Sequence, residues 1–137
     1  MSAYRRRRPS LNSALVAAIV GAAIHDLAEF GRPAPSNTGL LLVVGASAAW
    51  CVRSDTRRIQ TIGATVLAAV AVTFLIGGAV ASVLPLPLWP WQPEQTLSHY
   101  AIHLLWAASI VPLLLVSIAE LHAFRRNDLR AELPAPR

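Results

Sequence analysis

The sequence predicts an all-α integral membrane protein with one domain, in which four transmembrane helices form an up-down-up-down bundle. Of its 137 residues, 55% are hydrophobic and only 14% are charged, whereas an ordinary soluble domain has roughly 25% charged residues. The apolar residues gather in four runs, and the twelve basic residues, all Arg, lie outside those runs. A chain so poor in charge would expose large apolar patches in water, so we expect lipid to surround it.

Each apolar run is a candidate span. The first, residues 11–30, carries no charge over its central part, residues 14–24. The second, residues 38–52, is short, near the lower limit of roughly 17 residues once its flanks are included. The third, residues 59–84, contains no charged residue, and the fourth, residues 97–121, is apolar through its middle. Since a spanning helix needs about 20 residues, the other three runs fit without adjustment.

The Arg residues set the predicted orientation. Eleven of the twelve lie before the first run, between the second and third, or after the fourth, and only Arg32 lies in the two other connections. Because Arg-rich flanks stay in the cytoplasm, this pattern predicts a multi-pass protein of the cell membrane with both termini cytoplasmic. The number of crossings must then be even, so the short second run also spans. Residues 1–10 and 123–137 become basic cytoplasmic tails around a transmembrane domain of residues 11–122.

Small residues and one proline indicate how the helices pack. Ala17 and Gly21 are four residues apart in the first run, and Gly77 and Ala81 are four apart in the third. In lipid, such pairs let two helix backbones approach closely, so we expect helix contacts there. Pro112 predicts a kink in the fourth helix, because proline removes one backbone donor and clashes one turn back.

The polar residues within the runs form two clusters. The first run ends with His25, Asp26 and Glu29, which crowd one side of a helix, and the fourth begins with His99 and His103, one turn apart. With the predicted topology, both clusters lie at the outer membrane face. At 1.5 Å per residue, His25 and His103 each lie roughly 7 Å below the outer helix ends. In an up-down-up-down bundle the first and last helices are neighbours, so the clusters are expected to meet.

Several kinds of site fit these five residues. Imidazole and carboxylate groups suit a metal ion such as Fe, Mn or Zn. A His from each of two helices could instead hold a haem, with Tyr100 and Trp106 as neighbours. A third interpretation is a proton or ion path in a small oligomeric channel or carrier. The plainest alternative is structural, in which the cluster only ties the first helix to the fourth.

The leading hypothesis is a small membrane subunit or accessory protein with a metal ion or haem at its outer face. The chain has no phosphate-binding loop, no nucleophile elbow and no soluble domain to hold a substrate, so an enzyme with its own active site is less expected than a subunit. The expected partners are the lipid bilayer and other membrane subunits or further copies of the chain. Nucleic acid is excluded, because the Arg residues form no continuous face with interleaved aromatic residues.

Overall fold

A computed structural model describes residues 10–85, 87 and 94–131 of the chain, and side chains are described as far as residue 127. The described part is helical and contains no strand. Four of its helical segments are long and apolar enough to cross a membrane: Leu11–Phe30, Pro35–Val52, Arg57–Val83 and Leu97–Asn127. The predicted N-terminal Arg tail up to residue 9 and most of the Pro- and Trp-rich connection between the third and fourth segments lie outside the described residues.

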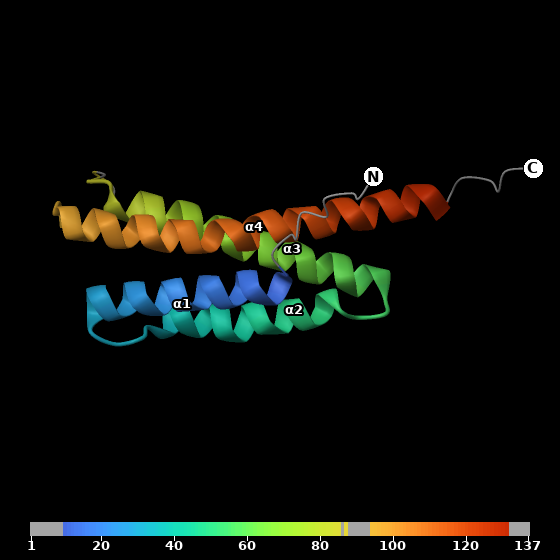
Figure 1. Ribbon diagram of the computed structural model, residues 1–137, viewed down its shortest axis with the longest axis horizontal. Helices are drawn as coiled ribbons and strands as arrows, with labels where there is room; N and C mark the ends of the chain where they lie inside the picture. The colour runs from blue at the N-terminus through green and yellow to red at the C-terminus, as the bar shows by residue number, and fades with distance from the viewer. Residues whose placement is uncertain (1–9, 86, 88–93, 132–137) are drawn as a thin grey trace, which may run out of the picture.

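Residues 31–34 connect the first helical segment to the second, and residues 53–56 connect the second to the third (Figure 1). Helix α1 is Leu11–Phe30, as predicted. The second segment consists of two π-helical stretches, η1 and η2, followed by α2, and the third consists of α3, the π-helical η3 and the short 3-10 turn η4. Their bounds are η1 Pro35–Gly39, η2 Leu41–Gly45, α2 Ala46–Val52, α3 Arg57–Thr73, η3 Phe74–Val80, η4 Ala81–Val83 and α4 Leu97–Ala131.

Two boundaries differ from the sequence prediction by three residues or more. The second segment begins at Pro35 rather than at residue 38, because proline is tolerated in a first helical turn and the next residues find hydrogen-bond partners described below. Helix α4 continues ten residues beyond the predicted end at residue 121. There Arg57 of α3 places its guanidinium carbon 5.1 Å from the centre of the Phe124 ring, a cation–π contact that supports the extension. Pro112 lies inside α4, which continues on both sides of it.

Local signals explain both ends of α1. The Ser10 side chain accepts a hydrogen bond from the backbone N–H of Ser13 at 3.2 Å, which satisfies one of the free donors of the first turn. At the other end Gly31 adopts a left-handed conformation, φ 66°, and its N–H donates to Leu27 O at 3.1 Å. Glycine adopts this conformation without a steric penalty and is the usual residue after the last helical turn. Helix α1 therefore ends directly after the last residue of its polar cluster, Glu29.

Helix α1 packs against α4, and α3 packs against both α4 and α2. The side of α1 that faces the core is made of small residues, with Ala14, Ala18 and Ala22 buried. A Cβ added to Gly21 would collide with the side chain of Ser109 on α4, so the two backbones approach closely here. Such close approach is how helices gain packing contacts in lipid.

The third segment approaches α4 closely at Gly78 rather than at Gly77. A Cβ on Gly77 would meet nothing within 4 Å, whereas one on Gly78 would collide with the indole ring of Trp106. The close contact of the third segment with α4 is therefore made one residue later than the four-residue spacing suggested. The other two predicted packing residues, Ala17 and Ala81, are half-buried.

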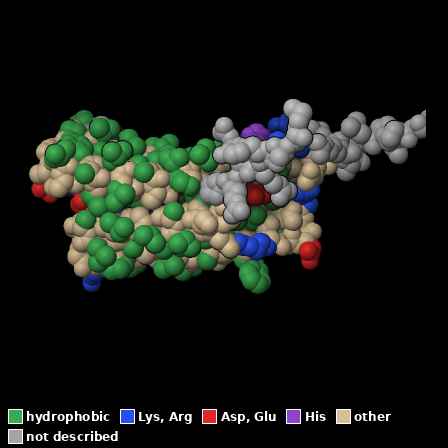
Figure 2. Space-filling model, in the orientation of Figure 1, with side chains coloured by type: hydrophobic (Ala, Val, Ile, Leu, Met, Phe, Trp, Pro, Cys, Tyr) green, Lys and Arg blue, Asp and Glu red, His purple; other side chains and the backbone are tan. Residues whose placement is uncertain are grey.

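Large apolar side chains cover the outside of the bundle. Figure 2 shows hydrophobic side chains along the length of the visible face, with charged ones toward its ends. Leu104, Val43 and Leu115 are each more than 60% exposed, on two different segments. In water these side chains would form aggregation-prone patches, but in a bilayer they would face the apolar lipid chains. The surface therefore fits a protein surrounded by a bilayer, as the four apolar helices indicate.

Gly63 offers a test of the close contact between α3 and α2. A Cβ on Gly63 would lie 2.6 Å from Ala48 O and 2.8 Å from Cys51 Cβ. We expect Gly63→Ala to destabilise the protein by about 1–3 kcal/mol relative to Gly77→Ala, because only the first forces two helices apart. Unfolding of both variants in detergent, followed by circular dichroism, measures the difference. Equal stability of the two variants would show that the helices do not pack this closely.

Candidate functional site

A cavity of about 520 Å³ lies at the end of the bundle where α1 ends and α4 begins. Four of the five predicted site residues line it: His25, Glu29, His99 and His103. The three histidines are each less than 10% exposed. The remaining lining comes from the end of α1, the second and third segments, the connection before α4 and α4 itself, and comprises Phe30, Asn37, Gly78, Ser82, Glu94 and Trp106.

The two deepest histidines meet edge to edge. Nε2 of His25 lies 3.3 Å from Nε2 of His103, and their ring centres are 4.6 Å apart with the planes at 82°. Trp106, on the next turn of α4, lies over the His25 ring with the centres 4.0 Å apart. The contact between α1 and α4 therefore aims two imidazole nitrogens at one point and fixes the ring of His25 from one side.

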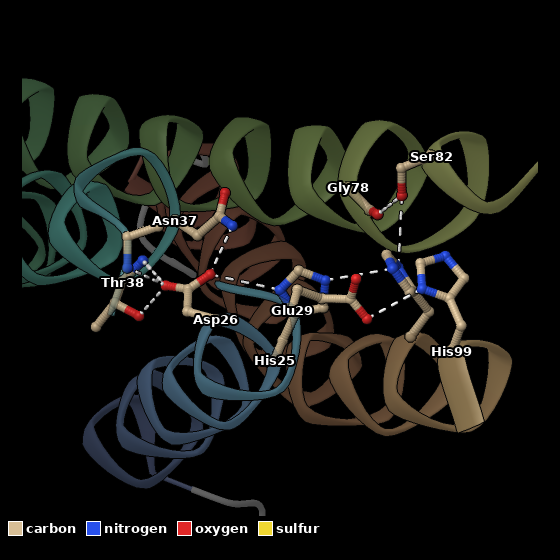
Figure 3. Close-up of polar contacts among 10 residues, drawn as sticks. His25, Asp26, Glu29, Asn37, Thr38, Gly78, Ser82 and His99 are labelled. Atoms are coloured by element: carbon tan, nitrogen blue, oxygen red, sulfur yellow. Dashed lines mark hydrogen bonds and ion pairs between the residues drawn. The ribbon is translucent and has the colours of Figure 1, made fainter. Parts of the chain in front are cut away.

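Each of these rings is also held at its second nitrogen. Nδ1 of His25 lies 3.4 Å from Oδ1 of Asp26, and Nδ1 of His103 lies 3.4 Å from Oγ of Ser82 (Figure 3). The hydroxyl of Ser82 donates to the carbonyl oxygen of Gly78, so toward His103 it presents an acceptor. Both contacts are long for hydrogen bonds, yet both place an oxygen where an Nδ1–H would donate.

These partners decide where the ring protons belong. A carboxylate can only accept, and the Ser82 hydroxyl already donates its hydrogen bond to the carbonyl oxygen of Gly78. Both neutral rings are therefore best satisfied with the proton on Nδ1, which leaves the two Nε2 lone pairs facing each other at 3.3 Å. Two such lone pairs repel unless a shared proton or a metal ion lies between them; otherwise one of the rings must carry its proton on Nε2 and donate it to the other ring.

Glu29 completes a group of three. Its Oε1 accepts a hydrogen bond from Nδ1 of His99 at 3.0 Å, and the carboxylate still has a second oxygen. One ligand atom from each of His25, Glu29 and His103 can be chosen so that all three lie within 4.8 Å of one another. Among the described residues this is a group with the composition and spacing of a metal site, two imidazoles and one carboxylate.

Asp26 does not join this group, although the sequence placed it in the site. Its side chain is 0% exposed and turns toward the beginning of the second segment (Figure 3). There its oxygens accept from Ala34 N at 2.8 Å, Asn37 Nδ2 at 2.7 Å, Thr38 N at 3.2 Å and Thr38 Oγ1 at 2.6 Å. Four donors compensate for burying the charge. Asp26 therefore fixes the connection between α1 and η1 and, through Oδ1, orients His25.

Of the two predicted aromatic neighbours, only Trp106 lines the cavity. Trp106 lines the cavity, while Tyr100 is 40% exposed and its hydroxyl donates to Gln95. Tyr100 is not among the residues that line the cavity, although its ring lies edge-on to that of His99 with the centres 6.3 Å apart. The reason is rotation about the axis of α4: Tyr100 follows His99 directly, and consecutive helical residues point about 100° apart.

Sequence reasoning missed the contributions of the second and third segments. Asn37 and Thr38 bind Asp26, and Ser82 lies beside His103. A signal existed for the first pair, since Asn37 and Thr38 follow Pro35 by two and three residues, and the first turn of a helix has free backbone donors. No comparable signal marks Ser82, because a serine within an apolar helix commonly bonds its own backbone, as Ser82 also does with Gly78.

The role of Asp26 can be tested by removing its charge. In Asp26→Asn, one acceptor oxygen becomes an NH₂ group that faces backbone and side-chain donors. Because hydrogen bonds to a charged group each contribute about 1.5–3 kcal/mol, we expect the free energy of unfolding to fall by about 3 kcal/mol. The exposed Asp55, in the connection between α2 and α3, supplies the control variant Asp55→Asn. Equal unfolding curves for the two variants, measured in detergent, would contradict the role assigned to Asp26.

Among known proteins the chain finds no counterpart that would assign this site. No family model, curated protein or solved structure matches it. The chemistry of the site is therefore argued from its own geometry.

Proposed function

We propose that the protein is a small integral membrane subunit or accessory protein that binds a metal ion through His25, Glu29 and His103. The observation that carries this proposal is that each of the three groups has a polar partner on an atom other than the one that would bind the metal. Asp26 lies at Nδ1 of His25, Ser82 at Nδ1 of His103, and His99 donates to one oxygen of Glu29. Metal ligands in proteins are typically oriented by such outer partners.

The donor set favours a divalent transition metal. Two imidazole nitrogens and one carboxylate oxygen are the ligands of catalytic zinc sites and of non-haem iron sites. With one dication, the charges of the Glu29 and Asp26 carboxylates are balanced, which lowers the cost of burying both in a membrane protein. Three protein ligands leave further coordination positions, and the cavity provides space beside them.

A haem fits this geometry less well than a single ion. Two histidines that hold a haem iron lie on opposite faces of a flat macrocycle. The ring centres of His25 and His103 are only 4.6 Å apart, so no macrocycle can pass between them as they lie. A haem would require the two helices to separate at their outer ends, whereas an ion needs only the space between three ligand atoms.

We further propose that the helices form an up-down-up-down bundle in the cell membrane with both termini in the cytoplasm, so that the cavity opens toward the outer face. The supporting observation is the distribution of Arg, eleven of them on one predicted side and only Arg32 on the other. The close packing of α1 on α4 is compatible with this order of helices.

Metal content tests the first proposal. We expect the protein purified in mild detergent to bind one transition-metal ion, and His25→Ala, Glu29→Gln and His103→Ala each to weaken binding by more than roughly 100-fold. Ser82→Ala should lower the affinity by about 10–100-fold without abolishing binding, as loss of an outer partner typically does. Elemental analysis and competition with a chelator of known affinity measure both effects.

The fourth histidine provides the control. His122 is exposed and lies near the other end of α4, so His122→Ala should bind metal like the wild type. A wild-type protein that binds no metal, with His103→Ala merely less stable, would contradict the proposal. The cluster would then serve only to hold α1 against α4. A Soret band in the absorption spectrum would instead favour haem.

The orientation can be tested with single cysteines in a Cys51→Ala background. Ser36 lies in the first turn of η1 and Thr56 in the connection before α3, and both are exposed. In intact cells we expect a membrane-impermeant maleimide to label Ser36→Cys but not Thr56→Cys, because only the first faces outward in the proposed topology. After cell lysis both should react. The opposite pattern in intact cells would reverse the assigned orientation.

A further inference from the structure

His99 has an unused acceptor. Its Nδ1 donates to Glu29 at 3.0 Å, so in the neutral ring the other nitrogen, Nε2, carries a lone pair. His99 is only 8% exposed, and among the described residues its Nε2 has no hydrogen-bond partner. Buried polar atoms are nearly always paired in folded proteins. An unpaired acceptor on a residue that lines a cavity therefore points to something that binds in the cavity.

Trp106 has an unused donor in the same place. Its side chain is 2% exposed, and its indole N–H likewise lacks a partner within the described part of the chain. Trp106 and His99 both line the 520 Å³ cavity. One unmet acceptor and one unmet donor beside a single cavity are complementary to a group that both donates and accepts hydrogen bonds, and a hydroxyl is the smallest group that does so.

The rest of the cavity limits the ligand further. Its volume lies within the range of about 300–1,000 Å³ typical of small-molecule sites. Phe30 and Trp106 supply apolar walls, while Glu94 adds an exposed carboxylate. That carboxylate repels anions, and the proposed ion is already balanced by Glu29 and Asp26. The walls and the charge balance together favour a neutral molecule with an apolar body.

We propose that the cavity binds a small, neutral, mainly apolar molecule through a hydroxyl group, which donates to Nε2 of His99 and satisfies the indole N–H of Trp106. The proposal rests on the proposed metal site only in that the hydroxyl oxygen would lie beside the open coordination positions of the ion. Such a molecule partitions into the bilayer, so the lipid phase can deliver it to a cavity at the end of a membrane bundle.

The test compares benzyl alcohol with benzyl methyl ether, which has the same apolar body but cannot donate a hydrogen bond. The full-length protein in detergent is saturated with Co²⁺, and each compound is titrated while the visible absorption of Co²⁺ is followed. The same titration of the metal-free protein is followed by tryptophan fluorescence. We expect the alcohol to bind at least tenfold more tightly than the ether in both titrations and to change the Co²⁺ spectrum.

Two variants connect this preference to the named atoms. His99→Phe keeps an aromatic ring but removes the acceptor, and Trp106→Phe removes the indole N–H, so each should bring the two affinities to within about threefold of each other. His122→Phe, near the other end of α4, should keep the wild-type preference. Equal binding of the two compounds by the wild type, no binding of either, or a preference that survives both variants would overturn the inference. Failure of Co²⁺ to bind, with the alcohol preference intact in fluorescence, would overturn the metal proposal alone.

Discussion

Helix α1 can lie directly against α4 because most of the residues that it buries before its polar cluster are alanine or glycine, and the site depends on that contact. A Cβ on Gly21 would already collide with Ser109, so no larger side chain fits between the backbones. One turn further along α1 from Gly21 lies His25, and its Nε2 reaches His103 at 3.3 Å. In lipid, where burying apolar surface between helices gains little, such short-range packing is the main attraction. The packing of small residues therefore sets the distance between the two imidazoles.

Asp26 contributes to the same site from the other direction. A buried carboxylate in a membrane protein is costly unless several donors satisfy it, and here Ala34, Asn37 and Thr38 provide them. Those donors belong to the connection after α1 and to the first turn of η1, so the carboxylate caps the second segment from the side. One residue thereby fixes a loop, starts a helix and leaves an oxygen for His25.

The sequence was sufficient for the coarse structure. Four apolar runs and their lengths predicted four candidate spans, and the structure contains four helices of that kind. It also predicted that His25, Glu29, His99 and His103 would come together, because each pair is spaced by one helical turn at the end of a run.

Finer details could not be derived from spacing alone. Residue spacing gives the face of a helix but not the rotation of that face toward its neighbours. The sequence therefore assigned Tyr100 and Trp106 the same role as neighbours of the site, although only Trp106 lines the cavity. Asp26 likewise belonged to the right cluster, but its donors lie eight to twelve residues away in a segment whose path the sequence did not define.

The π-helical stretch η3 has a consequence for the length of the third segment. The hydrogen bonds of a π turn span one residue more than those of an α turn, so every residue after it is rotated from the place that a regular helix would give. Gly78, whose added Cβ would collide with Trp106 on α4, lies within this stretch. Ser82, beyond the stretch, lies beside His103 in this shifted phase. The number of residues between Phe74 and Ser82 therefore sets the direction of the Ser82 side chain. Deleting one of them would turn the serine away from His103, although the composition of the helix would hardly change.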